Sequence, residues 1–311
     1  MSRQHWDEFY ATNSPPSNYD DSQKQIKLFC EKHHHNNQRI VLVTSGGTTV
    51  PLEHNTVRFV DNFSGGVRGA ASTEYFLKCG YAVIFLHRFK SVEPFTRHFG
   101  GQKFLEMLDI DKNEQETSIT VKPEYIKELA PILVSYKTAH KEGRLLCVNF
   151  TTLSDYFWLL RAACESLTVF GSNAMLYLAA AVSDFFIPPN QMSTHKISSD
   201  AAPSIHLQLV PKLLTPIVSD WLPNAFVVSF KLETDPNILI NKARGALTKY
   251  KHKLVIGNML HTRRTAVIFV KPDSSEEVRI TQEQAANGVD LEDSIVTKVI
   301  AEHSLFIERE G

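Results

Sequence analysis

The chain has 311 residues, 43% of them hydrophobic, and its 33 basic and 34 acidic side chains leave a formal net charge of −1. The hydrophobic share is enough for a substantial core. Balanced charge argues against general binding to nucleic acid or to a membrane surface. Because the cysteines form no CxxC pair, we expect four reduced, buried thiols rather than disulfides or a zinc site: Cys30, Cys79, Cys147 and Cys164.

The N-terminus lacks the apolar core of a secretory signal and carries Asp7 and Glu8 early. No apolar run approaches the length of a membrane span. We therefore expect a cytoplasmic protein that does not use a membrane. Residues 12–21 are rich in turn formers, so we predict an irregular N-terminal segment over 1–21 and a single domain over 22–311.

Apolar runs and helical periodicities alternate along the chain. The predicted strands cover 39–44, 81–86, 145–150, 174–181, 225–230, 253–257 and 266–270, the last at the edge of the sheet. The predicted helices cover 22–33, 66–79, 123–141, 152–167, 236–250 and 291–303. This alternation predicts an α/β fold, a Rossmann-like open and mostly parallel sheet with helices on both faces. The stretch 100–122 has no motif that we can interpret.

Two glycine-rich loops lie near the first predicted strand. Gly46 and Gly47 follow that strand directly, and the segment 58–69 carries three glycines at the start of the next helix. Free backbone amides in such loops can bind phosphate. Each loop alone is weak evidence, since a Gly-Gly pair is usually a turn and Ser64 could be a helix N-cap. Two such loops at one sheet edge favour a phosphate site.

The loops do not match a dinucleotide fingerprint. That motif needs G-x-G-x-x-G between the first strand and its helix, with an acidic residue ending the second strand. Here the second strand ends in Leu86-His87-Arg88. Arg88 would suit a 2′-phosphate, so an NADP-dependent reductase stays a second hypothesis. A non-catalytic nucleotide-binding protein is the third.

Four other residues that could contact a ligand follow predicted strands or lie in loops. Asp184 comes after three alanines and could cap a turn or face a ligand. Lys196, in a polar loop, could be solvated or close over polyphosphate. Phe230 could be core or flank a base, and Asn258 has the donors and acceptor to read a base edge.

Taken together, eight segments resemble the phosphopantothenate–cysteine ligase family, in family order. They are VTSGGTTVPLE (43–53), VRFVDNFSGGVRGAASTEYFL (57–77), FTTLSDY (150–156), YLAAAVSDFFIP (177–188), HKISS (195–199), VPKLL (210–214), SFKLETDP (229–236) and VIGN (255–258). The chain looks like the stand-alone eukaryotic form, without a fused flavin-dependent decarboxylase. The resemblance implies that 22–311 is one ligase domain, that the protein is a homodimer, and that it acts in coenzyme A biosynthesis.

The family's reaction has two steps. The carboxylate of 4′-phosphopantothenate attacks the α-phosphorus of a nucleoside triphosphate, with Mg²⁺, and expels pyrophosphate. The amine of cysteine then attacks the acyl nucleotide and expels the monophosphate. Splitting amide formation in this way exchanges a poor leaving group for a good one.

The resemblance also implies residue roles. Catalytic roles are implied for Asn62, which holds the acyl group, for the loop lysine Lys196, and for Asp184. The implied binding positions are Gly46, Ser64, Gly66 and Gly69 for the triphosphate, Phe230 and Asn258 for the base, Ala180, Ala181 and Asp184 for phosphopantothenate and the intermediate, and Arg58 for the neighbouring subunit's substrate.

The chain departs from the family's pattern in two places. Bacterial relatives that favour CTP carry two lysines on the helix before the final strand, where this chain has Ala246 and Tyr250. We therefore expect ATP, with CTP as the alternative. Thr49 stands where animal members often have a lysine, which argues against a charge role at that position. No residues are assigned as metal ligands.

Overall fold

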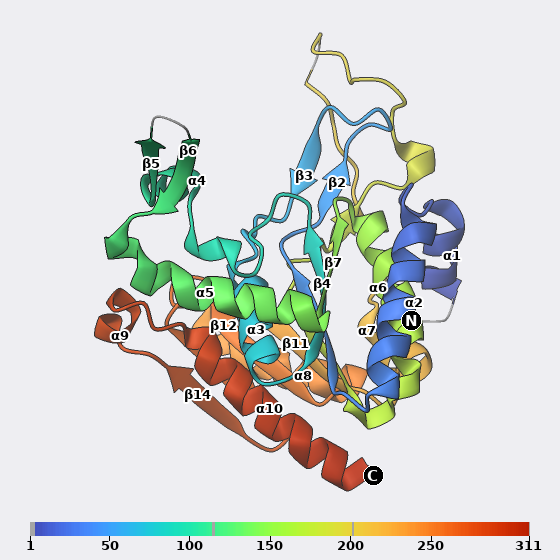
Figure 1. The fold of residues 1–311 in the computed structure, drawn as a ribbon. Coiled ribbons are helices and arrows are strands. Elements are labelled where there is room, and N and C mark those ends of the chain that lie inside the picture. Colours follow the sequence, from blue (N-terminus) through green and yellow to red (C-terminus); the bar gives the residue numbers. More distant parts are fainter. Residues whose placement is uncertain (1–3, 114–115, 201, 311) are drawn as a thin grey trace.

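The computed structural model describes residues 4–113, 116–200 and 202–310. At its centre is an eight-stranded sheet with the order β14-β13-β12-β11-β8-β1-β4-β7 (Figure 1). Six neighbouring strands are parallel, and β13 and β14 are antiparallel. The strands are β1 (Ile40–Ser45), β4 (Ala82–Arg88), β7 (Leu145–Phe150), β8 (Ala174–Leu178), β11 (Phe226–Glu233), β12 (Leu254–Met259), β13 (Ala266–Val270) and β14 (Ser275–Arg279). The predicted open, mostly parallel α/β sheet is confirmed.

Alternating side chains of the central strands feed two core layers. In β1, Ile40 and Leu42 join one apolar cluster, and Val41 and Val43 join the other. The first cluster includes α2 (Tyr19–His35) and α6 (Leu153–Leu167). The second includes α3 (Val67–Lys78), α10 (Leu291–Glu310) and part of α5 (Pro123–Glu142). In a third, small cluster, α8 (Pro236–Tyr250) packs against β12 and β13. Helices therefore cover both faces, because the central strands are apolar on both sides.

The N-terminal segment differs from the prediction. Residues 1–21 were expected to be irregular, but a helix, α1 (Gln4–Thr12), precedes α2, which already starts at Tyr19. Phe9 and Tyr10 are buried in the first core cluster, and the Tyr10 hydroxyl donates to the Phe157 carbonyl at 2.9 Å. Tertiary packing of aromatic side chains stabilises this helix next to a turn-rich stretch.

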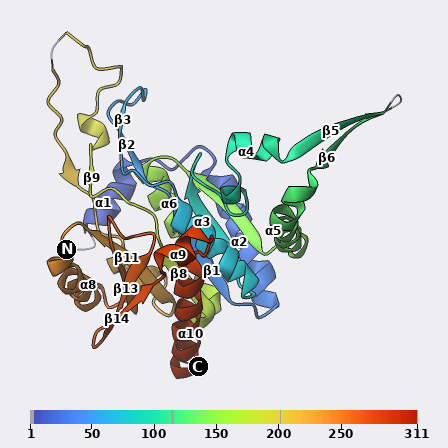
Figure 2. The ribbon, with the colours of Figure 1, turned by 90° about the vertical axis from the view of Figure 1, so that its left-hand side faces the viewer.

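Two smaller expectations also need correction, and one stretch without a prediction gains a structure. The strand at 266–270 is not at the edge, because β14 continues the sheet beyond it. Of the four cysteines, Cys79 and Cys147 are exposed rather than buried. The uninterpreted stretch 100–122 forms α4 (Gly101–Glu106) and the hairpin of β5 (Leu108–Asn113) with β6 (Glu116–Val121), which projects from the body (Figure 2). The sequence of this hairpin is short and contains several charged residues, so no hydrophobic pattern predicted its strands.

Two small sheets stand beyond the carboxyl ends of the central strands. β2 (Thr49–Pro51) pairs with β3 (Phe59–Asp61), and β9 (Phe185–Phe186) pairs with β10 (Gln208–Leu209). The segment 187–200, which follows β9, runs beside the β2–β3 hairpin (Figure 1). Among the helices of the described residues, none combines the length and the apolar character that crossing a bilayer requires.

Two buried histidines predict a loss of stability in acid. The His303 Nε2 donates to the Ser172 carbonyl at 2.8 Å, and Nδ1 accepts from the Tyr81 hydroxyl at 2.8 Å. Burial lowers the pKa of His303 and of His252 from 6.5 to about 4. Between these values the unfolded chain binds protons that the folded chain does not, so the free energy of unfolding falls as pH falls.

We expect the urea midpoint of unfolding to drop from about pH 7 to about pH 4.5, and His303→Gln to make this drop smaller. Glutamine can donate to the Ser172 carbonyl and does not titrate. His34→Gln, at an exposed position, is the matched control and should keep the wild-type slope. An equally steep drop in His303→Gln would contradict this assignment.

Candidate functional site

Backbone hydrogen bonds join the loops after β1 and β8 into one surface. The Gly46 carbonyl accepts from the Ala181 amide at 2.7 Å, and the Thr48 amide donates to the Ala181 carbonyl at 3.1 Å. The Thr44 hydroxyl accepts from the Ala180 amide at 3.1 Å. The first glycine loop and the alanines that follow β8 therefore share one edge of the sheet, as the strand-end rule predicts.

The predicted phosphate-binding glycines have local structural reasons. Gly46 has φ +81°, and a Cβ there would lie 2.7 Å from the Arg88 Cβ. Gly66, with φ +82°, is the N-cap of α3. A Cβ on Gly69 would lie 2.5 Å from the Ser45 Cβ. These close contacts hold the α3 N-terminus, with its unpaired amides, against the loop after β1, a geometry that suits an anion.

The second glycine loop also settles one alternative. Ser64 is not the helix N-cap, because Gly66 occupies that position and the helix starts at Val67.

Sequence analysis gave no role to Arg68, yet its guanidinium lies 5.8 Å from the Phe230 ring centroid. Arg68 also pairs with Glu292 at 3.0 Å. A fixed cation thus accompanies the predicted base-binding residue.

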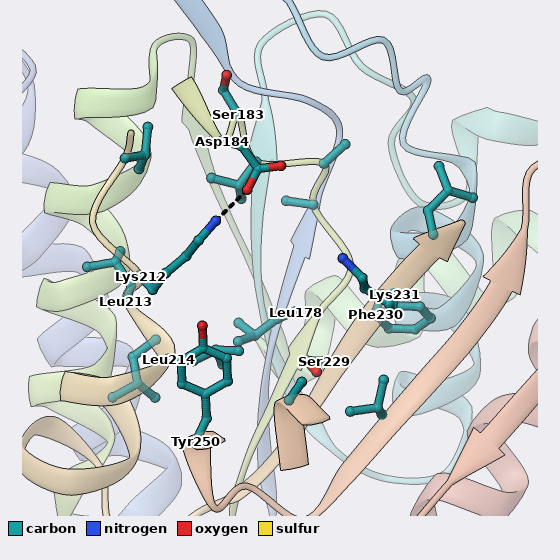
Figure 3. A pocket seen from close by; sticks show the side chains of 18 of the residues that line it. Leu178, Ser183, Asp184, Lys212, Leu213, Leu214, Ser229, Phe230, Lys231 and Tyr250 are labelled. Atoms are coloured by element: carbon teal, nitrogen blue, oxygen red, sulfur yellow. Dashed lines mark hydrogen bonds and ion pairs between the residues drawn. The ribbon is translucent and has the colours of Figure 1, made fainter. Parts of the chain in front are cut away.

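The main cavity, of about 630 Å³, opens between α6 and α8 above β8 and β11 (Figure 3). Five predicted site residues line it: Asn62, Ala180, Ala181, Asp184 and Phe230. A second cavity of about 180 Å³ also includes Asn62 and Asp184 in its lining. These two residues therefore lie where the cavities meet, which suits them to handling groups from both sides.

Lysines give the main cavity a cationic character. Lys212 forms an ion pair with Asp184, shown by the dashed line in Figure 3. Lys231 and Lys242 pair with Glu233 at 3.3 and 3.0 Å. Burial alone would raise the pKa of Glu233, but the hydrogen bonds from these lysines outweigh it and lower the pKa. A phosphorylated ligand could exchange for these internal partners.

Arg58 is engaged inside its own chain. Its Nη1 donates to the Glu53 Oε1 and to the Ile197 carbonyl, both at 3.1 Å. Glu53 is fully buried and accepts from the backbone amides of Arg58 at 3.0 Å, Val57 at 3.2 Å and Ile197 at 3.4 Å. The Arg58 amide contributes most to lowering the pKa of Glu53. We call this set of contacts the Glu53–Arg58 latch.

The latch fixes the loop that carries Lys196. The same loop bonds the hairpin through the His54 amide and the Ser193 carbonyl at 2.9 Å, and through the Asn55 amide and the Thr194 carbonyl at 3.1 Å. The Lys196 side chain itself is exposed and belongs to the lining of neither cavity described above. The structure thus brings the loop, but not this ammonium group, to the site.

The remaining predicted positions are peripheral to the main cavity. Asn258 is buried on β12, in register with Leu232 of β11. Thr49 is buried, and its hydroxyl donates to the Thr151 carbonyl at 2.8 Å. Arg88, which kept the reductase hypothesis open, pairs with Asp61 at 2.6 Å.

Sequence reasoning missed cavity residues for which signals existed. Lys212 lies within the quoted stretch VPKLL, and Ser229 directly precedes Phe230. Tyr250 was considered only as a departure from the CTP pattern, yet both Tyr250 and Ala246 line the main cavity. A basic residue between apolar neighbours, or a serine within a buried strand, is too common to be singled out alone.

Residues 160–298 match the family model of the DNA/pantothenate metabolism flavoprotein C-terminal domain. The chain is 47% identical to the phosphopantothenate–cysteine ligase of Mus musculus, over 85% of this chain and 86% of that protein. It is 40% identical to the ligase CAB2 of Saccharomyces cerevisiae, over 97% and 86%. A solved structure of a Cab2 mutant in complex with phosphopantothenate-cysteine matches with a TM-score of 0.88 at 40% sequence identity. The match covers 98% of this chain and 99% of the chain in that structure. The chain belongs to the phosphopantothenate–cysteine ligase family.

Proposed function

We propose that this protein forms the amide between (R)-4′-phosphopantothenate and L-cysteine, a step of coenzyme A biosynthesis, in the cytoplasm. The observation that carries the proposal is the meeting of Asn62, Asp184 and Phe230 in one cavity, from three separate segments of a chain of this family. The cavity's lysines suit a substrate that carries a phosphate and a carboxylate.

The proposed chemistry proceeds through an acyl-adenylate. A carboxylate oxygen of phosphopantothenate attacks the α-phosphorus of ATP and pyrophosphate leaves. The cysteine nitrogen then attacks the acyl carbon, loses its proton, and AMP leaves with the bridging oxygen. Ala246 and Tyr250, the positions that led us to expect ATP over CTP, both line the main cavity, which supports nucleotide selection there.

The protein's part is to position reactants and stabilise charge. Asn62, at the junction of the cavities, is suited to donate to the acyl oxygen. Asp184 can accept from phosphopantothenate once Lys212 turns to a phosphate. Lys196 is proposed to fold over the polyphosphate from its latched loop.

Mg²⁺ is expected to arrive with the triphosphate. Within the described residues, no group of three or more histidine, cysteine or acidic side chains could hold a metal by itself. Mg²⁺ in nucleotide enzymes is usually held by substrate phosphates and water with one or two carboxylates, and we propose the same arrangement for this protein. Asp184 lines the main cavity, and Glu233 pairs with two of its lysines, so we propose these two carboxylates for that role.

The direct assay supplies purified protein with phosphopantothenate, cysteine and Mg-ATP, and follows the nucleotide products. AMP and pyrophosphate support the proposal, and ADP with inorganic phosphate would exclude an adenylate. Binding of NADPH without ligation would favour a reductase, although the Arg88–Asp61 pair offers that reading no free cation.

We also propose a homodimer in which Arg58 assists the neighbouring subunit. Next to it, Phe59 and Phe63 are exposed to 50% and 91%, an apolar surface that a second copy would cover. Mixing Arg58→Ala with Asn62→Asp should restore part of the activity, because one site of a mixed dimer would carry both native residues. Confirmed subunit exchange without recovery would count against a shared site.

A further inference from the structure

A serine–histidine pair forms part of the main cavity wall and has no role in the proposed chemistry. Ser229, on β11, lines the cavity, and its Oγ lies 2.8 Å from the His252 Nε2 (Figure 3 shows Ser229). His252 is only 4% exposed. Its other ring nitrogen, Nδ1, is buried and has no hydrogen-bond partner among the residues that the structure describes. A buried nitrogen left unpaired needs an explanation.

The tautomer of His252 decides what Ser229 offers to the cavity. If Nδ1 carried the proton, a buried N–H donor would have no acceptor. The Ser229 hydroxyl would then donate its proton to Nε2 and could not donate to a ligand. If Nε2 carries the proton, only an acceptor is left unpaired, which is the less costly defect. The His252 Nε2–H then donates to the Ser229 Oγ, and the serine hydroxyl proton is free to point into the cavity. His252 thereby makes Ser229 a fixed donor.

The surroundings of this donor suit a flat heterocycle. Phe230, Tyr250 and the aliphatic Leu178 line the cavity together with Ser229 (Figure 3). Ala246 belongs to the same lining. Aromatic and aliphatic walls favour a planar ring. The cations that could meet phosphates, such as Lys212 and Lys231, line other parts of the same cavity. A nucleotide could therefore place its base at Ser229 and its phosphates among the lysines.

We propose that Ser229, held in place by His252, donates a hydrogen bond to a ring nitrogen of the adenine of ATP. This inference rests on the proposed use of a nucleoside triphosphate, and it makes Ser229 a specificity residue and His252 a positioning residue. A site built to pair with a polar atom rejects analogues that lack it.

The test compares ATP with its 1-deaza, 3-deaza and 7-deaza analogues, each of which replaces one ring nitrogen by a C–H group. In the wild-type protein, one analogue should show a KM raised about 3- to 10-fold, the size of one hydrogen bond. Ser229→Ala should raise the KM for ATP similarly and leave that analogue no worse than ATP. The KM for phosphopantothenate should stay unchanged. Ser135→Ala, on the exposed face of α5, is the control.

His252 variants separate positioning from packing. His252→Leu should behave like Ser229→Ala, whereas His252→Gln, whose amide can donate to the serine, should recover the KM for ATP. If His252→Leu fails to fold, the Ser229→Ala and deaza comparison still decides the matter. Equal KM values for ATP and all three analogues, or a Ser229→Ala effect on phosphopantothenate alone, would overturn the inference. A wild-type protein that does not consume ATP would instead refute the proposed function.

Discussion

Asn62→Asp is expected to lower overall turnover about 10³-fold, the effect of losing one donor aimed at developing negative charge. Asn62 lies where the two cavities meet, beside Asp184. A carboxylate at position 62 removes the amide donor and adds a second negative charge next to an anionic acyl phosphate. The second step should suffer most, so acyl-adenylate should accumulate in rapid-quench samples analysed by mass spectrometry.

Asn224→Asp makes the same chemical change at an exposed position and should keep wild-type turnover. Unchanged turnover in Asn62→Asp would refute a catalytic role for Asn62. A loss of turnover in which both binding and folding fail would show instead that Asn62 is structural, so thermal unfolding must be recorded beside the kinetics.

Glu53→Ala is expected to lower kcat about 10²-fold, the size of effect that a misplaced catalytic element can produce. Glu53 accepts from the Arg58 side chain and from the backbone amide of Ile197, next to Lys196. Without this carboxylate, the loop that carries Lys196 loses its bond to Glu53 and keeps the backbone bonds of Ser193 and Thr194 to the hairpin. Amide hydrogen exchange over residues 193–197 should accelerate together with the fall in kcat.

Glu53→Gln keeps an acceptor oxygen but loses the charge, so it should lie between Ala and wild type. Glu308→Ala, at an exposed position on α10, is the control. Faster exchange with an unchanged kcat would show that the latch fixes the loop but that its position does not matter to catalysis.

The strand pattern was enough to predict which edge of the sheet borders the main cavity. Buried, β-branched runs predicted the parallel strands, and parallel strands end on one edge. That placed Ala180 and Phe230, near the ends of the strands predicted over 174–181 and 225–230, close to each other. The structure confirms this, since both line the main cavity.

Side-chain pairings between distant segments could not be predicted in this way. Arg58 and Ile197 are joined across 139 positions of sequence, and no local pattern encodes such a contact. The same holds for Lys212 with Asp184 and for Ser229 with His252. The helix α1 was missed because its stability comes from packing on α6 rather than from its own propensity.

The role of Asn258 and of the glycine amides toward a nucleotide stays a prediction. Gly46, Gly66 and Gly69 each satisfy a local demand of backbone conformation or close packing. A glycine needed for folding is also able to expose its amide to phosphate, so both explanations are compatible. Binding of ATP to Gly69→Ala would not separate them, because the Cβ would clash with Ser45.

If phosphopantothenate is activated as an acyl-adenylate, one oxygen of its carboxylate must pass to AMP, and isotope labelling can follow that oxygen. Phosphopantothenate labelled with ¹⁸O in its carboxylate is converted with cysteine and Mg-ATP, and the products are analysed by mass spectrometry. The acyl-adenylate mechanism predicts one ¹⁸O atom in the phosphate of AMP and none in pyrophosphate. Label in inorganic phosphate, with ADP as the nucleotide product, would contradict it.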